Sequence, residues 1–238
     1  MLALSVKGVI LSPPGRCPVE AASRAFTDAA LDELRGARWT PRGWARFAWA
    51  VTTRSGEQLI RHPRAALELS FLHGVFLILA GRRGRWWVAS SWVMSVTHLG
   101  LLGERRSIGW ANTVTMTRAN LAVIGAPLGR WVGMVAIASD KLDGVLARRR
   151  GPTMFGYYAD TLADAAFWTW LAGRDDENRA VVAASVAAWV APVVAVGAAS
   201  IAKGEVVAGP RPAVLRPAAA MQALLAIRAL RAGRTVRR

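Results

Sequence analysis

The chain has 238 residues, of which 53% are hydrophobic and 19% are charged. Its apolar residues gather in runs of about 15 to 20, which is typical of membrane-spanning helices and argues against an ordinary soluble domain. The formal net charge is +16, and the arginines lie between the apolar runs. Because positive charge flanks membrane helices, we expect a lipid bilayer and no nucleic acid as partner. Cys17 is the only cysteine, which excludes an intrachain disulfide and a cysteine-based metal site.

The first segment, residues 1–65, is mixed and mostly polar, and we expect it to be cytoplasmic or interfacial. Residues 27–34 are typical of the start of a short helix. Thr40 is placed to cap a second helix, with Pro41 in its first turn. This second helix carries aromatic residues that would rest it on a membrane surface. These residues are Trp44, Phe47 and Trp49.

Seven apolar runs follow, and we expect each to form a helix. They are residues 67–80, 86–103, 113–128, 131–148, 155–172, 181–201 and 217–230. Several runs are shorter than the roughly 20 residues of a spanning helix, so their polar ends must be counted in or the bilayer must be locally thin. The predicted fold is all-α: a polytopic membrane helix bundle with about six transmembrane helices and N-terminal interfacial helices. Residues 66–104 would supply two additional membrane helices, 105–201 the core, and 202–238 a basic loop and a C-terminal membrane or interfacial helix.

The charges of the loops suggest an orientation in the cell membrane. The arginines at 148–150 should be cytoplasmic by the positive-inside rule, and the acidic loop at 174–179 suits the outside. Counting back places Arg105 and Arg106 inside, as the rule asks, but places the turn at 82–85 outside, against it. Because the C-terminal arginines would fall outside if the last helix spanned, we favour a cytoplasmic surface position for that helix.

Acidic side chains interrupt two neighbouring runs with helical spacing. Asp140, Asp143, Gly144, Ala147 and Arg148 share one stripe of a helix, because neighbours on a helix face are three or four residues apart. A second stripe, on the next helix, holds Gly156, Asp160 and Asp164. If the turn at 149–153 lets the two helices pack antiparallel, four carboxylates converge on one point.

Such a cluster is costly at membrane depth, by at least about 2.5 kcal/mol for each ionised group. Divalent cations offset this cost, and carboxylate oxygens without nearby His or Cys favour Mg²⁺ or Mn²⁺ over zinc. The glycines permit close approach of a ligand or of the facing helix, and Arg148 at the helix end is placed to bind phosphate. A plainer interpretation is a set of structural ion pairs with Lys141 and residues 148–150, but it leaves Asp160 and Asp164 unexplained.

The segment resembles the signature of the CDP-alcohol phosphatidyltransferase family, D-x2-D-G-x2-A-R-x8-G-x3-D-x3-D. All eight defined residues are present, and one spacing differs, because seven residues rather than eight separate Arg148 from Gly156. Upstream, Asn112, Thr115 and Arg118 are similar to the start of the family's first core helix. The specific match covers residues 112–172. The region after residue 201 has room for one helix instead of two, and the runs before residue 104 would fill the missing places in the bundle.

The resemblance implies a reaction in which a CDP-linked donor gives a substituted phosphoryl group to an acceptor alcohol and releases CMP, in phospholipid biosynthesis. CDP-diacylglycerol would be the donor, and two Mg²⁺ or Mn²⁺ ions would be the cofactors. The active site would face the cytoplasm, residues 105–201 would form the transferase core, and a homodimer is a possible assembly. The implied metal ligands are Asp140, Asp143, Asp160 and Asp164, with Asp164 also the general base. The implied CDP site is Gly144, Ala147, Arg148 and Gly156.

The sequence leaves some alternatives open. Arg118 would either pair with a helix-borne acid or bind an anionic group of the acceptor, because an intramembrane arginine is a functional candidate. Membrane prenyltransferases also hold Mg²⁺ on helix-borne aspartates, but their motif does not demand Gly144, Ala147 or Arg148. A non-enzymatic transporter with an acidic ion path would usually show repeat symmetry, which the sequence lacks.

Overall fold

The computed structural model describes residues 18–175, 178–207 and 216–235, and within these ranges it is helical without strands. The all-α prediction is therefore confirmed for the described part of the chain, and each of the seven predicted apolar runs overlaps one of the helices α3 to α9, although the runs 86–103 and 113–128 continue into 3₁₀ segments. The α-helices are α1 (Pro18–Gly36), α2 (Pro41–Arg61), α3 (Pro63–Leu79), α4 (Gly81–Thr97), α5 (Gly109–Ile124), α6 (Val132–Arg150), α7 (Met154–Asp175), α8 (Arg179–Lys203) and α9 (Arg216–Thr235). Two 3₁₀ helices lie in the connections: η1 (Leu99–Leu102) follows α4, and η2 (Ala126–Trp131) lies between α5 and α6.

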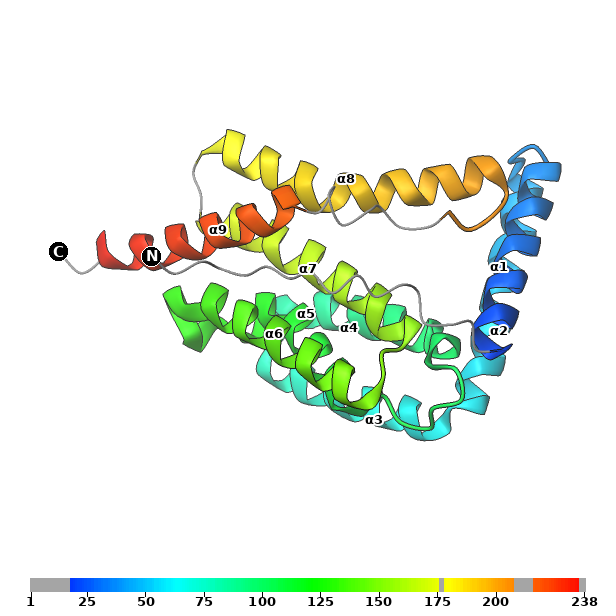
Figure 1. Ribbon diagram of the computed structural model, residues 1–238, viewed down its shortest axis with the longest axis horizontal. Coiled ribbons are helices and arrows are strands. Elements are labelled where there is room, and N and C mark those ends of the chain that lie inside the picture. Colours follow the sequence, from blue (N-terminus) through cyan, green and yellow to red (C-terminus); the bar gives the residue numbers. More distant parts are fainter. Residues whose placement is uncertain (1–17, 176–177, 208–215, 236–238) are drawn as a thin grey trace.

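Helices α1 and α2 form a hairpin that runs across one end of the bundle, transverse to α8 (Figure 1). The start of α2 is as predicted, since the Thr40 hydroxyl accepts a hydrogen bond from the Gly43 amide at 3.2 Å and Pro41 opens the helix. Helix α1 begins at Pro18 and is longer than the short helix expected around residues 27–34.

Several turns meet at the end of the bundle where α1 and α2 lie, which we call the hairpin end. Nη2 of Arg105 donates hydrogen bonds to the carbonyls of Arg150 at 2.7 Å and Gly151 at 2.9 Å. The amide of Val206, just after α8, donates to a carboxylate oxygen of Asp28 on α1 at 2.6 Å. The prediction that the turns of Arg105 and of residues 148–150 share one end is therefore confirmed, while the side of a membrane that this end faces stays a prediction.

Helix α5 is the centre of the bundle. It packs extensively against both α6 and α7, and α3 and α4 cover another of its faces. The backbones of α6 and α7 do not approach each other closely along their length, but their side chains meet in one core cluster that includes Val132, Phe167 and Trp168. Arg118 of α5 is one physical reason for this arrangement, because its guanidinium forms ion pairs with Asp143 of α6 and Asp164 of α7. Helices α3 and α4 thus pack against α5, and their role in filling the missing places of the bundle stays a prediction.

The C-terminal helix α9 is part of the packed core. Leu225 and Ala229 of α9 are buried in one cluster with Val132 of α6 and with Phe167 and Trp168 of α7. The sequence favoured a peripheral surface helix here because of its flanking arginines. The structure instead buries one apolar face of α9 against α6, α7, α8 and η2, so the helix contributes to the core.

Helix α8 is long and apolar enough to cross a membrane, and only 6% of its most apolar 18-residue window is buried. Helix α5 and the η2–α6 segment pass the same test only when taken together, and they are bent by 116° at the break between Ile124 and Ala126. Within the described ranges, one helix, or two if the bent pair counts as one span, therefore has membrane-spanning length and composition. Helices α3 and α4 have 17 residues each, and α6 and α7 carry the aspartates. About six spans stays a prediction.

Candidate metal centre

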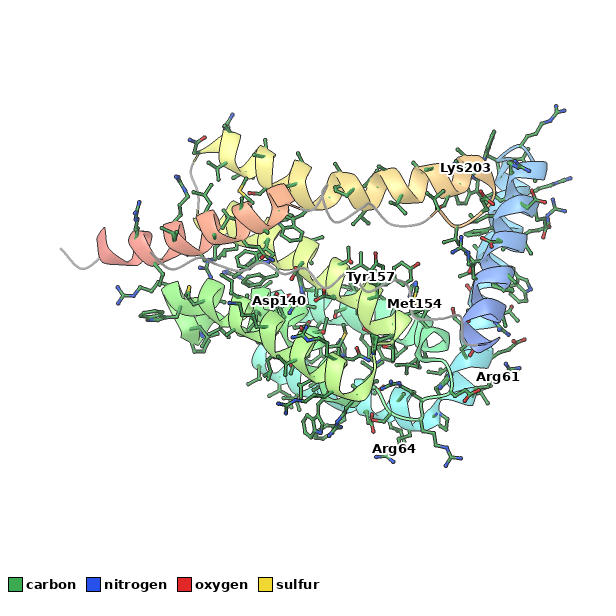
Figure 2. The ribbon with its side chains drawn as sticks, in the orientation of Figure 1. Arg61, Arg64, Asp140, Met154, Tyr157 and Lys203 are labelled. Carbon is green, nitrogen blue, oxygen red and sulfur yellow. The ribbon has the colours of Figure 1, made fainter. Side chains whose placement is uncertain are left out.

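The four aspartates of the signature meet around one arginine in the middle of the bundle. Asp140 and Asp143 come from α6, Asp160 and Asp164 come from α7, and all four form ion pairs with Arg118 of α5. Figure 2 places Asp140 about midway along the bundle, away from Met154 and Lys203 at the hairpin end. The predicted convergence of the four carboxylates is thus observed, and α5 rather than a direct α6–α7 contact brings it about.

The guanidinium of Arg118 divides its nitrogens among the carboxylates. Nη1 lies 2.9 Å from Oδ2 of Asp143 and 3.6 Å from Oδ1 of Asp140. Nε lies 2.9 Å from Oδ1 of Asp164, and Nη2 donates a hydrogen bond to Asp160. Among the described residues, the ion pairs of these aspartates all go to Arg118, not to Lys141 or to residues 148–150. Of the two roles that the sequence left open for Arg118, pairing with acids is the one observed.

The site is open on one side. The side chain of Arg118 is 0% exposed, and those of Asp143 and Asp164 are 8% and 11% exposed. By contrast, the side chains of Asp140 and Asp160 are 39% and 46% exposed. The carboxylates of Asp140 and Asp160 therefore face the surroundings, and a ligand would approach the cluster from their side.

Three of the four carboxylates have a spacing that suits a metal ion. Asp140, Asp143 and Asp160 each offer a ligand oxygen, and these oxygens all lie within 4.8 Å of one another. A set made only of carboxylate oxygens fits hard divalent cations such as Mg²⁺ and Mn²⁺. Asp164 is not in this group and lies 2.9 Å from Nε of Arg118, so its predicted role as a ligand stays a prediction.

Two further residues hold the carboxylates in place, and the sequence did not assign them roles. The Thr115 hydroxyl donates to Oδ2 of Asp143 at 2.7 Å, and Nε2 of Gln222 on α9 donates to Oδ2 of Asp164 at 3.2 Å. Thr115 precedes Arg118 by three residues, so helical spacing already places both on one face of α5. Gln222 had only a weak signal, as a polar residue inside an apolar helix.

The residues predicted to line a CDP site lie along the same helices, toward the hairpin end. A Cβ on Gly144 would lie 3.3 Å from Nη1 of Arg148, so the arginine folds back along α6 over the glycine. Ala147 is half-buried, and Arg148 is exposed. A Cβ on Gly156 would lie 2.6 Å from Oδ1 of Asn112, so Gly156 allows α7 to approach α5 closely. The role of these positions in binding CDP stays a prediction.

The contact at Gly156 predicts a stability change. Gly156→Ala should destabilise the protein by about 1–3 kcal/mol, because Asn112 is buried and bonded to the carbonyl of Ile108 at 2.7 Å and has little room to move. Gly173→Ala in the same helix is the matched control, since nothing lies within 4 Å of its added Cβ. It should be neutral or stabilising by up to about 1 kcal/mol. Thermal unfolding of both variants checks this, and equal melting temperatures for the two would contradict the close approach.

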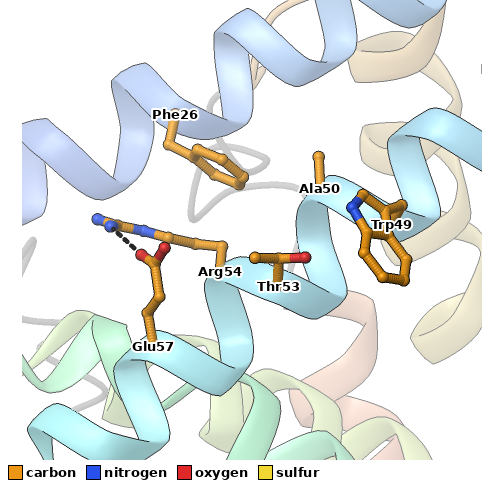
Figure 3. Close-up of a pocket in the computed structure, with 6 residues that line it drawn as sticks. All are labelled: Phe26, Trp49, Ala50, Thr53, Arg54 and Glu57. Carbon is orange, nitrogen blue, oxygen red and sulfur yellow. Dashed lines mark hydrogen bonds and ion pairs between the residues drawn. The ribbon is translucent and has the colours of Figure 1, made fainter.

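A concave feature lies in the hairpin, apart from the aspartates. Figure 3 shows this hollow of about 360 Å³ between α1 and α2. Arg54 lies over the ring of Phe26, 5.5 Å from its centroid, and forms an ion pair with Glu57 at 3.2 Å. Because these two charges neutralise each other within the hollow, it adds nothing to the metal chemistry of the candidate site. Its other lining residues are Trp49, Ala50 and Thr53.

Comparison with known proteins does not add to this description. No family model matches the chain, and neither a curated protein nor a solved structure matches it. The functional argument therefore depends on the residues of the aspartate cluster and their arrangement.

Proposed function

We propose that the chain is a CDP-alcohol phosphatidyltransferase, a membrane enzyme that transfers a substituted phosphoryl group to an alcohol and releases CMP. The donor is CDP-diacylglycerol, and the transferred group is the phosphatidyl group. One observation carries the proposal: the aspartates of the signature gather at one place, and three of them bring ligand oxygens within 4.8 Å of one another. An arrangement of carboxylates on adjacent helices is what a divalent-metal phosphotransferase needs.

The residues fit Mg²⁺ or Mn²⁺ because the donor set consists of carboxylates alone. Asp140, Asp143 and Asp160 would hold the metal, with Asp164 as a further ligand when two ions are bound. The bound metal supplies positive charge that stabilises the negative charge developing on the phosphate oxygens. Thr115 donates a hydrogen bond of 2.7 Å to Oδ2 of Asp143, which keeps this ligand in place.

The proton of the acceptor hydroxyl goes to Asp164. The acceptor oxygen then forms a bond to the phosphorus that carries the diacylglycerol, and the bond from that phosphorus to the bridging oxygen breaks. CMP leaves with that oxygen and its electron pair, and Asp164 returns the proton to solvent. Gln222 donates to one carboxylate oxygen of Asp164, and Nε of Arg118 lies 2.9 Å from the other, so the base has a fixed orientation.

The donor is bound along α6 between the aspartates and the hairpin end. Gly144 and Ala147 have small side chains, which leave room for a ligand along this face of α6. Arg148 lies about two helical turns from Asp140 toward the hairpin end. Because the Arg148 side chain is exposed, its guanidinium is available to pair with the diphosphate. Gly156 lets α7 approach α5 closely, so that α7 would border the donor on the side opposite α6. Acceptor binding by Arg118 is not part of the proposal, because its guanidinium is already engaged by four carboxylates.

A lipid environment accounts for the exposed apolar surface. Helix α8 leaves 94% of its most apolar window unburied, and large apolar residues of α3 are exposed, among them Phe71 at 77% and Ile78 at 82%. Soluble monomers rarely expose contiguous apolar surface of this extent. We therefore place the chain in the cell membrane as a multi-pass protein, with the hairpin end and the opening of the site on the cytoplasmic side.

The proposed orientation predicts opposite labelling of the two ends of α7. In a Cys17→Ser background, a cysteine at Arg149 should react with a membrane-impermeant maleimide only after cells are opened. A cysteine at Ala180, at the start of α8, should react in intact cells, because both positions are exposed but lie at opposite ends of the bundle. Labelling of both positions from the same side would contradict the proposed topology.

The activity itself is tested by the release of CMP. Purified protein is incubated with CDP-diacylglycerol, Mg²⁺ or Mn²⁺ and a panel of alcohols that includes glycerol phosphate, inositol phosphate and serine. We expect CMP release that needs both the metal and one of the alcohols. Release of diphosphate from a prenyl diphosphate, with no CMP from any CDP-linked donor, would support a prenyltransferase instead.

A further inference from the structure

We propose that Arg118 is a built-in counter-cation that holds the aspartate cluster together in the absence of metal and competes with divalent cations for it. The inference rests on the metal site of the proposed function and adds a control on metal binding to it. It assigns the arginine to the carboxylates of its own chain and not to a substrate.

The first support is the completeness of the burial. The Arg118 side chain is 0% exposed, and its guanidinium contacts carboxylates from two different helices. A buried guanidinium is stable only when it is paired and hydrogen-bonded, and here the partners are the four aspartates of the candidate site. The buried guanidinium would be unpaired without the aspartates, and the aspartates would repel one another without the guanidinium, so the two stabilise each other.

The second support is the overlap with the candidate metal ligands. Nη1 of Arg118 contacts Asp140 and Asp143, and Nη2 contacts Asp160. The same three carboxyl groups form the set that could hold a metal ion. A cation that binds these groups must therefore share them with the guanidinium or displace it, since both draw on the same negative charge.

The third support is the balance of charge. When all groups are ionised, the four carboxylates and the guanidinium carry a net charge of −3, compared with −4 for the carboxylates alone. A net charge of −3 is still enough to attract a divalent ion. Without Arg118, the acids would repel one another in the metal-free protein. A metal would then meet a more negative site. Removing Arg118 should therefore weaken the metal-free protein and strengthen its attraction for metal.

The test compares melting temperatures of the purified full chain in detergent, first with a chelator and then across a titration with Mn²⁺. We expect Arg118→Gln to lower the metal-free melting temperature and to lower the half-saturating Mn²⁺ concentration by on the order of tenfold. Arg64→Gln is the matched control, because this exposed arginine pairs with Glu68 and lies outside the cluster. It should behave as the parent protein does in both measurements.

A second variant keeps the test decisive if Arg118→Gln unfolds without metal. Asp143→Asn should lower the metal-free melting temperature of the parent protein but raise that of Arg118→Gln purified in Mn²⁺ and then stripped of it. The change of sign arises because the same carboxylate is a partner in one background and a repelling charge in the other. Arg118→Lys, which keeps the charge, should melt between the parent and Arg118→Gln.

The outcomes separate this inference from the proposed function. An equal or weaker response of Arg118→Gln to Mn²⁺ overturns the inference even if the parent protein releases CMP. A response in Arg118→Gln that the parent lacks would support competition by the arginine. No response in either protein would overturn the inference, and CMP release by the parent would then show whether the transferase proposal survives it.

Discussion

Asp164→Asn is expected to lower the rate of CMP release by about a thousandfold while leaving the protein folded. An amide cannot take the proton of the acceptor hydroxyl, and a positioned general base typically contributes about a hundredfold to ten-thousandfold. The asparagine keeps an oxygen that can accept from Gln222, so the packing of α9 against α7 should persist. The measurement is kcat for CMP release at saturating metal, alongside the melting temperature.

Asp32→Asn serves as the control for Asp164→Asn. Asp32 is 65% exposed and pairs with Arg35 on the surface of α1, so the same chemical change there should leave kcat within about twofold, as is usual for surface substitutions. If Asp164→Asn retained CMP release within a few-fold of the parent while Asp32→Asn did the same, the assignment of Asp164 as base would be wrong.

Asp143→Asn is expected to raise the half-saturating Mn²⁺ concentration by about a hundredfold or more and to reduce CMP release in proportion. Asp143 is the most buried of the three candidate ligands and is fixed by Thr115 and Arg118. A neutral amide is a poor ligand for a hard cation, which prefers carboxylate oxygens. The measurement is the rise in melting temperature during a Mn²⁺ titration, compared with the metal dependence of the activity.

Thr115→Val is the graded companion to Asp143→Asn. It keeps the carboxylate but removes the 2.7 Å hydrogen bond that orients it, so a loss of about ten- to a hundredfold in metal affinity is expected from a supporting residue of this kind. An unchanged metal response in Asp143→Asn would mean that the metal, if bound, lies elsewhere. The order of effects, with Asp143→Asn larger than Thr115→Val, is therefore the feature to check.

The helices themselves were predictable because their signals are local. The apolar runs have lengths and breaks that mark helices, and Thr40 with Pro41 marks the start of α2 through capping chemistry. The aspartate stripes were predictable for the same reason, since spacings of three and four residues put Asp140 with Asp143, and Asp160 with Asp164, on single faces.

The sequence did not predict which helix packs against each helix face. Helical periodicity shows which side of a helix is polar but not which helix it meets. For this reason the packing of α5 against both α6 and α7, with Arg118 paired to aspartates of each, was not foreseen. The contact of Gln222 with Asp164 joins residues 58 positions apart, and it depends on α9 packing into the core, which the arginines around that helix argued against.

The most direct test of the transferase proposal follows the phosphorus atom of the donor. CDP-diacylglycerol is radiolabelled in the phosphate next to the diacylglycerol and incubated with the purified protein, Mn²⁺ and the acceptor alcohol that gives the highest CMP release. The account predicts that all label moves to a new phospholipid, that unlabelled CMP appears in equal amount, and that both stop when the metal is chelated. Absence of CMP, label recovered only as phosphatidate, or release that persists with the metal chelated would contradict it.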